Sequence, residues 1–139
     1  MKILVADGVS PKGIEILQKA GFETVIKDKL PAEELLEIIP DFDGLIVRSA
    51  SKVTKEVIER AKKLKIVGRA GVGTDNIDIN AATAHGIMVI NSPGGNTIAA
   101  TEHTMGMMMA MARNIAVANE TMQHGEWNRK KIYRCRTSR

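Results

Sequence analysis

The sequence of 139 residues has one cysteine, few aromatic side chains and no long apolar run. The single cysteine, Cys135, excludes an internal disulfide framework and fits a reducing compartment. No apolar stretch approaches the roughly 18 residues that a membrane-spanning helix needs. The N-terminal MKILVADG has the pattern of a strand and lacks the architecture of a signal peptide. We therefore expect one cytoplasmic protein domain with no membrane partner.

The net charge of +4 originates at the C-terminal end. Residues 129–139 hold six of the 20 basic residues and no acid, so the rest of the chain has 14 basic against 16 acidic residues, a net of −2. Such a tail could be an RNA- or membrane-binding arm, or a solvated or interrupted segment. Tyr133 is its only aromatic residue, so there is no stacking pattern. We favour the second interpretation, expect no nucleic-acid partner, and expect residues 125–139 to be disordered or aberrant in sequence.

Short apolar runs alternate with segments of helical periodicity through the first two thirds of the chain. The expected strands are 3–6, 22–26, 44–47, 66–67 and 88–90, and the expected helices are 11–20, 31–39, 54–64 and 79–85. Ser10 and Pro11 suit a helix N-terminus, and Gly21 suits a helix stop. This alternation implies parallel pairing with right-handed crossovers. We predict a flavodoxin-like three-layer α/β domain over residues 1–96.

The segment KIVGRAGVGTDN, residues 65–76, is the most informative part of the sequence. Its glycines let backbone N–H groups face a bound anion closely, because no Cβ stands in the way. Arg69 lies inside the segment, and Arg48 ends an earlier apolar run, LIVRSA. Two arginines at strand ends beside a glycine loop indicate a crevice that binds carboxylate or phosphate.

Four polar segments are expected to meet at one edge of the sheet, since ligands of such domains lie at the carboxyl ends of the strands. They are Asp7-Gly8, Arg48-Ser49, Gly71 to Asn76, and Asn91 to Asn96. Turns alone would explain the glycines, serines and asparagines, because turns need these residues. The arginines are harder to explain in that way.

Residues 97–122 predict one long helix, rich in alanine and methionine. A copper-binding or redox role for the methionines is conceivable, but methionine in a helix usually fills gaps in a core. Because the helix is apolar around most of its circumference, we expect it to lie between two domains. The chain contains strands for only one domain. The helix should therefore lack a neighbour, and we expect self-association or local disorder.

The block from Arg48 to Asn114, together with HGEWNRKK at residues 124–131, resembles the N-terminal part of the D-isomer-specific 2-hydroxyacid dehydrogenases. The resemblance covers residues 1 to about 131. It implies a substrate-binding domain, then an interdomain helix at residues 97–124, then a Rossmann domain that binds NAD, with the active site between the domains. It also implies a homo-oligomer, and an arginine, a glutamate and a histidine that act in hydride transfer from later in the chain. None of these catalytic positions falls within the 139 residues.

The resemblance implies a set of substrate-facing positions, and it implies that the substrate is a small anionic 2-hydroxy acid or 2-keto acid. These positions are Arg48, Ser49, Arg69, Val72, Gly73, Asn76 and Asn96. Arg48 and Ser49 would bind the anionic end of the substrate, and the N–H groups of Val72 and Gly73 its carboxylate. Val72 would also pack near the nicotinamide of NAD, and Asn96 would lie at the cleft entrance. The RS and GRAGVGTDN segments favour 3-phosphoglycerate, oxidised to 3-phosphohydroxypyruvate in serine biosynthesis, over lactate, glycerate or formate.

Other residues with catalytic chemistry have simpler explanations. Glu102 and His103 are adjacent in a helix and so do not face each other. His85 and His124 have no partner nearby in sequence and are expected to be helix-end residues. No metal site is expected.

The chain departs from the family at its end, where KK is followed by IYRCRTSR instead of a strand and a G-x-G-x-x-G turn. The GRAGVG loop is no substitute, because Asn76 stands where that fingerprint needs a glycine. We expect a frameshift product, a truncated gene or a fragment that binds NAD weakly if at all and does not turn over substrate. The alternative is a standalone binding or regulatory module for an acidic metabolite. A phospho-acceptor receiver domain is excluded, since Arg48 stands where its acceptor aspartate would be.

Overall fold

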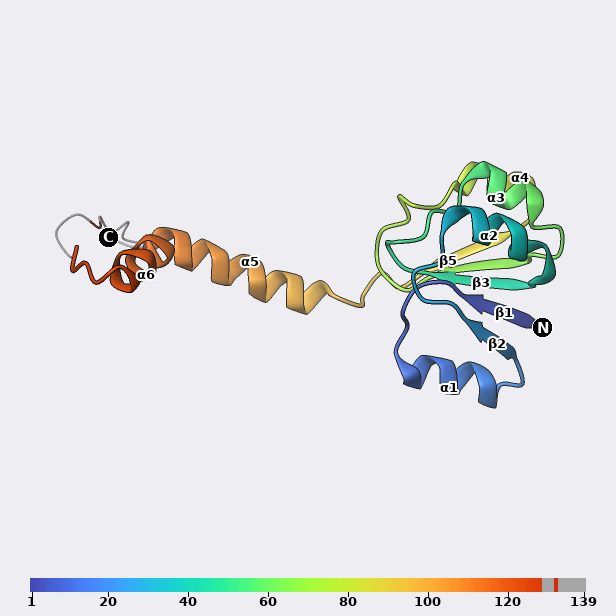
Figure 1. Ribbon diagram of the computed structural model, residues 1–139, viewed down its shortest axis with the longest axis horizontal. Coiled ribbons are helices and arrows are strands. Elements are labelled where there is room, and N and C mark those ends of the chain that lie inside the picture. Colours follow the sequence, from blue (N-terminus) through green and yellow to red (C-terminus); the bar gives the residue numbers. More distant parts are fainter. Residues whose placement is uncertain (129–131, 133–139) are drawn as a thin grey trace. The chain divides into compact units, whose positions relative to one another are not determined.

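The computed structural model describes residues 1–128 and 132, and it divides into two units, Met1–Gly95 and Asn96–Arg139 (Figure 1). The first unit contains the whole sheet and four α-helices. The described residues of the second form two helices. None of the helices in the described part of the chain is long and apolar enough to cross a membrane.

Five parallel strands form the sheet of the first unit, in the order β2-β1-β3-β4-β5. Their bounds are β1 Lys2–Val5, β2 Glu23–Ile26, β3 Gly44–Val47, β4 Ile66–Arg69 and β5 Met88–Asn91. The central strands read as continuous apolar runs because both of their faces are covered or partly covered. This is the strand order of flavodoxin-like domains, so the predicted fold is confirmed.

Helices lie on both faces of the sheet, which gives the three layers expected from the sequence (Figure 1). The helices are α1 Pro11–Lys19, α2 Ala32–Ile38, α3 Lys55–Arg60 and α4 Ile79–Ala84, with a 3-10 helix at Ile39–Asp41. α2, α3 and α4 cover one face (Figure 1), where Leu4, Leu45 and Val67 of the sheet belong to the same buried cluster as Leu35 and Ile58 of the helices. The core therefore lies on this side. α1 covers the other face and has no buried residue.

Local signals fix most of the helix ends. Thr54 accepts a hydrogen bond from the N–H of Val57 at 3.5 Å, and Asp78 accepts one from Ala81 at 2.9 Å, as N-cap side chains do. Gly21 follows α1 with a φ of +83°, a left-handed conformation that glycine adopts freely. One predicted end was wrong, since α3 stops at Arg60 instead of residue 64. The helix predicted at residues 31–39 ends at Ile38, and the 3-10 helix with Pro40 follows it.

The second unit corrects the prediction of one long helix. The segment forms α5 (Thr97–Ala112) and α6 (Ile115–Gln123), separated at Asn114, whose φ of 51° and ψ of 37° are left-handed. Asparagine visits this conformation more readily than most residues, so it can end one helix and start the next. No residue of either helix is buried, and the methionines of α5 expose about half of their surface or more, from 48% at Met109 to 74% at Met111. Within the second unit, the described residues therefore bury no part of either helix completely.

A hydrogen bond ties the start of β1 to the loop before β3. The N–H of Lys2 donates to Asp43 Oδ2 at 2.8 Å. This bond holds the pKa of Asp43 below its ordinary value, and the positive charges of Lys65, the N-terminus and Lys63 act in the same direction against desolvation.

Candidate functional site

The carboxyl ends of β1, β3, β4 and β5 meet at one edge of the sheet. The register pairs Val47 of β3 with Arg69 of β4, and Arg69 with Asn91 of β5. The loop after each strand therefore starts beside its neighbour. The predicted convergence of the polar strand ends is confirmed for the segments of the first unit.

Asp7, directly after β1, is the most buried polar residue of this edge, with 5% of its surface exposed. Its Oδ2 accepts hydrogen bonds from the N–H groups of Arg48, at 2.6 Å, and Ser51, at 3.1 Å. Its Oδ1 accepts one from the Ser51 hydroxyl at 2.8 Å. A carboxylate can be buried when donors surround it in this way. Asp7 thus fixes the loop after β3 from one side.

Asn76 fixes the same loop from the other side. Its amide Nδ2 donates to the carbonyl oxygens of Arg48, at 2.6 Å, and Ser51, at 2.7 Å. Its Oδ1 is buried and has no hydrogen-bond partner within the described residues. Both N–H groups of this amide are therefore used on the loop after β3, a contact that the sequence did not predict.

Arg48 and Ser49 lie on the exposed part of the loop after β3. The Arg48 guanidinium donates through Nη1 to the carbonyl of Gly8 at 3.2 Å. This single bond leaves its other N–H donors available to an anion, and a guanidinium can bind phosphate or carboxylate through two of them.

The glycine loop after β4 presents backbone donors. Within the described residues, no group accepts a hydrogen bond from the N–H of Val72 or Gly73. Asn91 donates to the carbonyl of Val72 at 2.7 Å, and the N–H of Ser92 donates to the carbonyl of Gly71 at 2.9 Å. Residues at the end of β5 therefore bind the carbonyl groups of the glycine loop, whereas the N–H groups of Val72 and Gly73 bond to none of the described residues. Such successive N–H groups can bind an anion.

Arg69 lies against this loop from the end of β4. A Cβ at Gly71 would collide with Nη1 of Arg69 and lie 2.9 Å from its Cζ, so the guanidinium lies where only glycine leaves room. The Nε of Arg69 is buried and has no partner within the described residues. Arg69 thus adds positive charge and an unused donor to the same edge.

Asn96 belongs to the second unit, where it is the N-cap residue of α5 and makes no capping hydrogen bond through its side chain. Its place in the substrate site stays a prediction. His85 and His124 each hydrogen-bond through Nδ1, at 2.9 Å, to a carbonyl of the helix that they follow. Both are C-cap residues, which confirms their assignment as helix-end residues.

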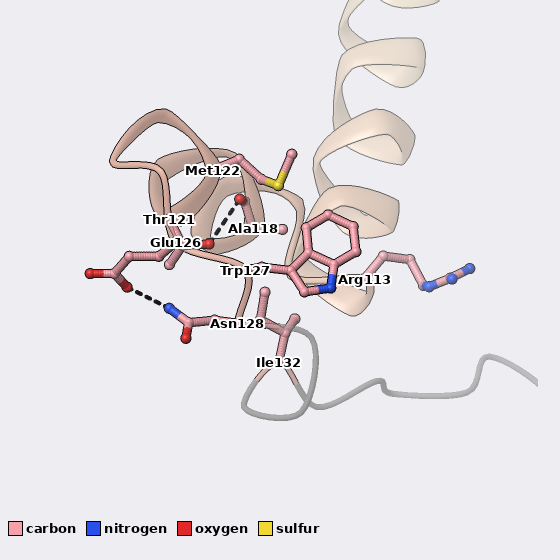
Figure 2. Close-up of a pocket in the computed structure, with 8 residues that line it drawn as sticks. All are labelled: Arg113, Ala118, Thr121, Met122, Glu126, Trp127, Asn128 and Ile132. Atoms are coloured by element: carbon pink, nitrogen blue, oxygen red, sulfur yellow. Dashed lines mark hydrogen bonds between the residues drawn. The ribbon is translucent and has the colours of Figure 1, made fainter.

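The second unit has a cavity of about 380 Å³ (Figure 2). It is lined by Arg113, Ala118, Thr121, Met122, Glu126, Trp127, Asn128 and Ile132. Two of its polar side chains bond to each other, Asn128 to Glu126 at 2.5 Å, and Thr121 donates to the carbonyl of Ala118 at 3.0 Å. The basic tail expected at residues 125–139 lies mostly outside the described residues.

The glycine loop after β4 lacks the arrangement that binds the pyrophosphate of NAD in dinucleotide folds. A dinucleotide fold needs a helix N-terminus directly after its glycine turn. Here α4 starts only at Ile79, and the amide of Asn76 is bonded to the loop after β3. No cluster of metal-ligating side chains occurs among residues 1–128.

The fold is that of a flavodoxin-like domain, with two arginines and a glycine loop at the carboxyl ends of its strands. Residues 3–132 match the family described as D-isomer specific 2-hydroxyacid dehydrogenase, catalytic domain, and the chain belongs to this family. The D-3-phosphoglycerate dehydrogenase of Archaeoglobus fulgidus is 50% identical over 132 residues, which are 95% of this chain and 25% of that protein. The chain thus spans about a quarter of the length of the curated relatives that it matches.

Two solved structures have the same fold. A protein from Thermus thermophilus superposes with a TM-score of 0.82 at 32% identity, covering 92% of this chain and 42% of the other. The NAD⁺-bound 3-phosphoglycerate dehydrogenase of Entamoeba histolytica superposes with a TM-score of 0.72 at 42% identity, covering 81% and 39%.

Sequence reasoning missed the parts of the site that hold the loops. Asp7 was taken only as a polar strand end, and Ser51 and Asn91 were not singled out as functional on their own. The signal for Asp7 was present, since an acid that directly follows a buried strand needs donors nearby. Its partners, however, lie 41 and 44 residues further along the chain, where no local pattern points to them.

Proposed function

We propose that the chain is the substrate-binding part of a D-3-phosphoglycerate dehydrogenase, which oxidises 3-phosphoglycerate to 3-phosphohydroxypyruvate in serine biosynthesis. Curated relatives of that name are 50% identical or more over nearly the whole chain. In this proposal NAD is the hydride acceptor, held by a further domain together with the groups that catalyse the transfer. The protein is then cytoplasmic and a homo-oligomer in its full-length form.

The proposal depends on one observation: a guanidinium and open backbone N–H groups lie on neighbouring strand ends. Arg48 follows β3, and the loop with Val72 and Gly73 follows β4, its hydrogen-bonded neighbour. 3-Phosphoglycerate carries an anion at each end. Its carboxylate would be received by the N–H groups of Val72 and Gly73, and its phosphate by Arg48 and Ser49, with Arg69 adding positive charge. Val72, 40% exposed, would then be available to the nicotinamide.

Isothermal titration calorimetry with 3-phosphoglycerate tests the proposal. We expect saturable binding by the purified chain, lost in Arg48→Ala, and no NADH formation when NAD is added. Absence of binding, or equal binding by Arg48→Ala, would contradict the substrate site. Formation of NADH by the chain alone would contradict the assignment of catalysis to another domain. Binding without turnover, in a chain shown to be complete, would favour the binding-module function.

A further inference from the structure

We infer that Asp7 and Asn76 act as a pair of positioning residues that hold Arg48 for the phosphate end of the substrate. The inference rests on the proposed function. Neither side chain needs to touch the substrate. Their role is to fix the backbone of residues 48–51, from which the Arg48 guanidinium extends.

The two side chains together satisfy both ends of this short loop. Asp7 accepts from the N–H groups of Arg48 and Ser51, and Asn76 donates to the carbonyls of the same two residues. One carboxylate and one amide thus hydrogen-bond to four backbone groups, the N–H and C=O of Arg48 and of Ser51. Without these bonds the loop backbone would be less restricted. The match is chemical as well as geometric, since a carboxylate only accepts and an amide nitrogen only donates.

The loop is buried at its point of attachment and exposed where it would bind the anion. Asp7 is 5% exposed and Ser51 is 7% exposed, whereas Arg48 and Ser49 are on the surface. The exposed guanidinium is therefore carried by a backbone with a buried attachment. Arg48 has one weak side-chain tether of its own, the 3.2 Å bond to the carbonyl of Gly8. Binding costs the long Arg48 side chain rotamer freedom, and a mobile backbone at residues 48–51 would add to this cost.

Asp7→Asn separates positioning from electrostatics by the sign of its effect. Asp7 is a negative charge close to a proposed anion site, so its removal should strengthen anion binding if charge alone mattered. The amide oxygen can still accept from the two backbone N–H groups, but these bonds lose the charge of the carboxylate, and the NH2 group cannot accept from the Ser51 hydroxyl, so the attachment is weakened. Positioning therefore predicts weaker binding in Asp7→Asn, by about tenfold or more, since hydrogen bonds to a charged group are among the stronger ones.

Two measurements test the inference, and Asp41→Asn serves as the control. Asp41 is an exposed acid, so its variant makes the same charge change away from the loop. Hydrogen exchange of the amides of residues 48–51 needs no ligand. Calorimetry with 3-phosphoglycerate and with glycerate reports how strongly the phosphate is preferred.

We expect faster exchange of the loop amides in Asp7→Asn, and a preference for 3-phosphoglycerate over glycerate that falls about tenfold or more. A general loss of stability would lower both affinities alike and leave their ratio unchanged. Asp41→Asn should match the wild type in both measurements. Unchanged exchange, or phosphate affinity equal to or above that of the wild type in Asp7→Asn, would overturn the inference.

Milder variants cover the case in which Asp7→Asn does not fold. Ser51→Ala removes only the hydroxyl bond to Asp7, and Asn76→Ala removes both bonds to the loop carbonyls. Both should exchange faster at residues 48–51 and lose phosphate preference, Asn76→Ala more than Ser51→Ala. Wild-type exchange and preference in both would overturn the inference. If the wild type binds no 3-phosphoglycerate, the proposed function fails, while the exchange of the loop amides still decides whether the pair holds the loop.

Discussion

Gly71→Ala should weaken anion binding while leaving the fold nearly as stable. A Cβ at this position would meet Nη1 of Arg69, with Cζ at 2.9 Å and Cδ at 3.5 Å, and no backbone atom is among these neighbours. The guanidinium is the far end of a flexible side chain, so it can move away. The backbone of Gly71 does not have a left-handed φ, so alanine is tolerated there.

The expected magnitudes follow from these contacts. Alanine restricts the unfolded chain, which stabilises the fold by about 0.4–1 kcal/mol and offsets the displacement of Arg69. The free energy of unfolding should then change by less than about 1 kcal/mol. Loss of a charged donor from the anion site should weaken 3-phosphoglycerate binding by about 1.5–3 kcal/mol, or roughly 10- to 150-fold.

Urea denaturation and calorimetry measure the two quantities, with Gly106→Ala as the control for affinity. A Cβ at Gly106, in α5, has no neighbour within 4 Å, so this variant makes the same chemical change outside the proposed site. Wild-type affinity in Gly71→Ala would refute the assignment of Arg69 to the anion site. A large loss of stability would refute the argument that the guanidinium can move away.

Three further predictions concern stability and association. Leu4→Ala removes a fully buried side chain from the centre of the sheet and should lower the free energy of unfolding, measured in urea, by about 2–5 kcal/mol. A change below about 1 kcal/mol would contradict the assigned core. The pKa of Asp43 is lower in the folded than in the unfolded protein, so the carboxylate stabilises the fold above the unfolded pKa, and this stability is lost as the pH falls through the folded pKa. Asp43→Asn should therefore flatten the acid side of a plot of melting temperature against pH. An unaltered profile would count against the hydrogen bond from Lys2. Met105 and Met108 lie one turn apart on α5, are about half exposed and should promote self-association. Replacing both with glutamate should therefore lower the mass measured by light scattering. A wild type that is monomeric at all concentrations would contradict this.

The sheet could be predicted from the sequence because each strand is a short apolar run bounded by turn residues. Gly44–Val47 was predicted with the correct bounds, and the other four strands agree within two residues. The break at Asn114 was missed because Met111 and Ile115, on either side of it, keep the spacing of one helix. The left-handed backbone conformation of Asn114 separates the two helices, and hydrophobic periodicity cannot predict the conformation of a single residue.

The candidate site could be predicted in part. Arg48 and the glycine loop stand out locally, since arginine and glycine at strand ends are unusual together. The bonds from Asp7 to Arg48 and from Asn76 to Ser51 join residues 41 and 25 positions apart, and only the parallel order of the strands brings them together. The orientation of Arg69 over Gly71 depends on side-chain packing, which no pattern of residue types encodes.

The most direct test of the central claim is an NMR titration of the amide signals of the chain with 3-phosphoglycerate. The account predicts saturable shifts confined to the carboxyl edge of the sheet, at Arg48, Ser49, Val72 and Gly73, and no such shifts with lactate at the same concentration. Shifts that cluster elsewhere, for example around Trp127 in the second unit, or no shifts at all, would contradict the claim that these strand ends form the substrate site.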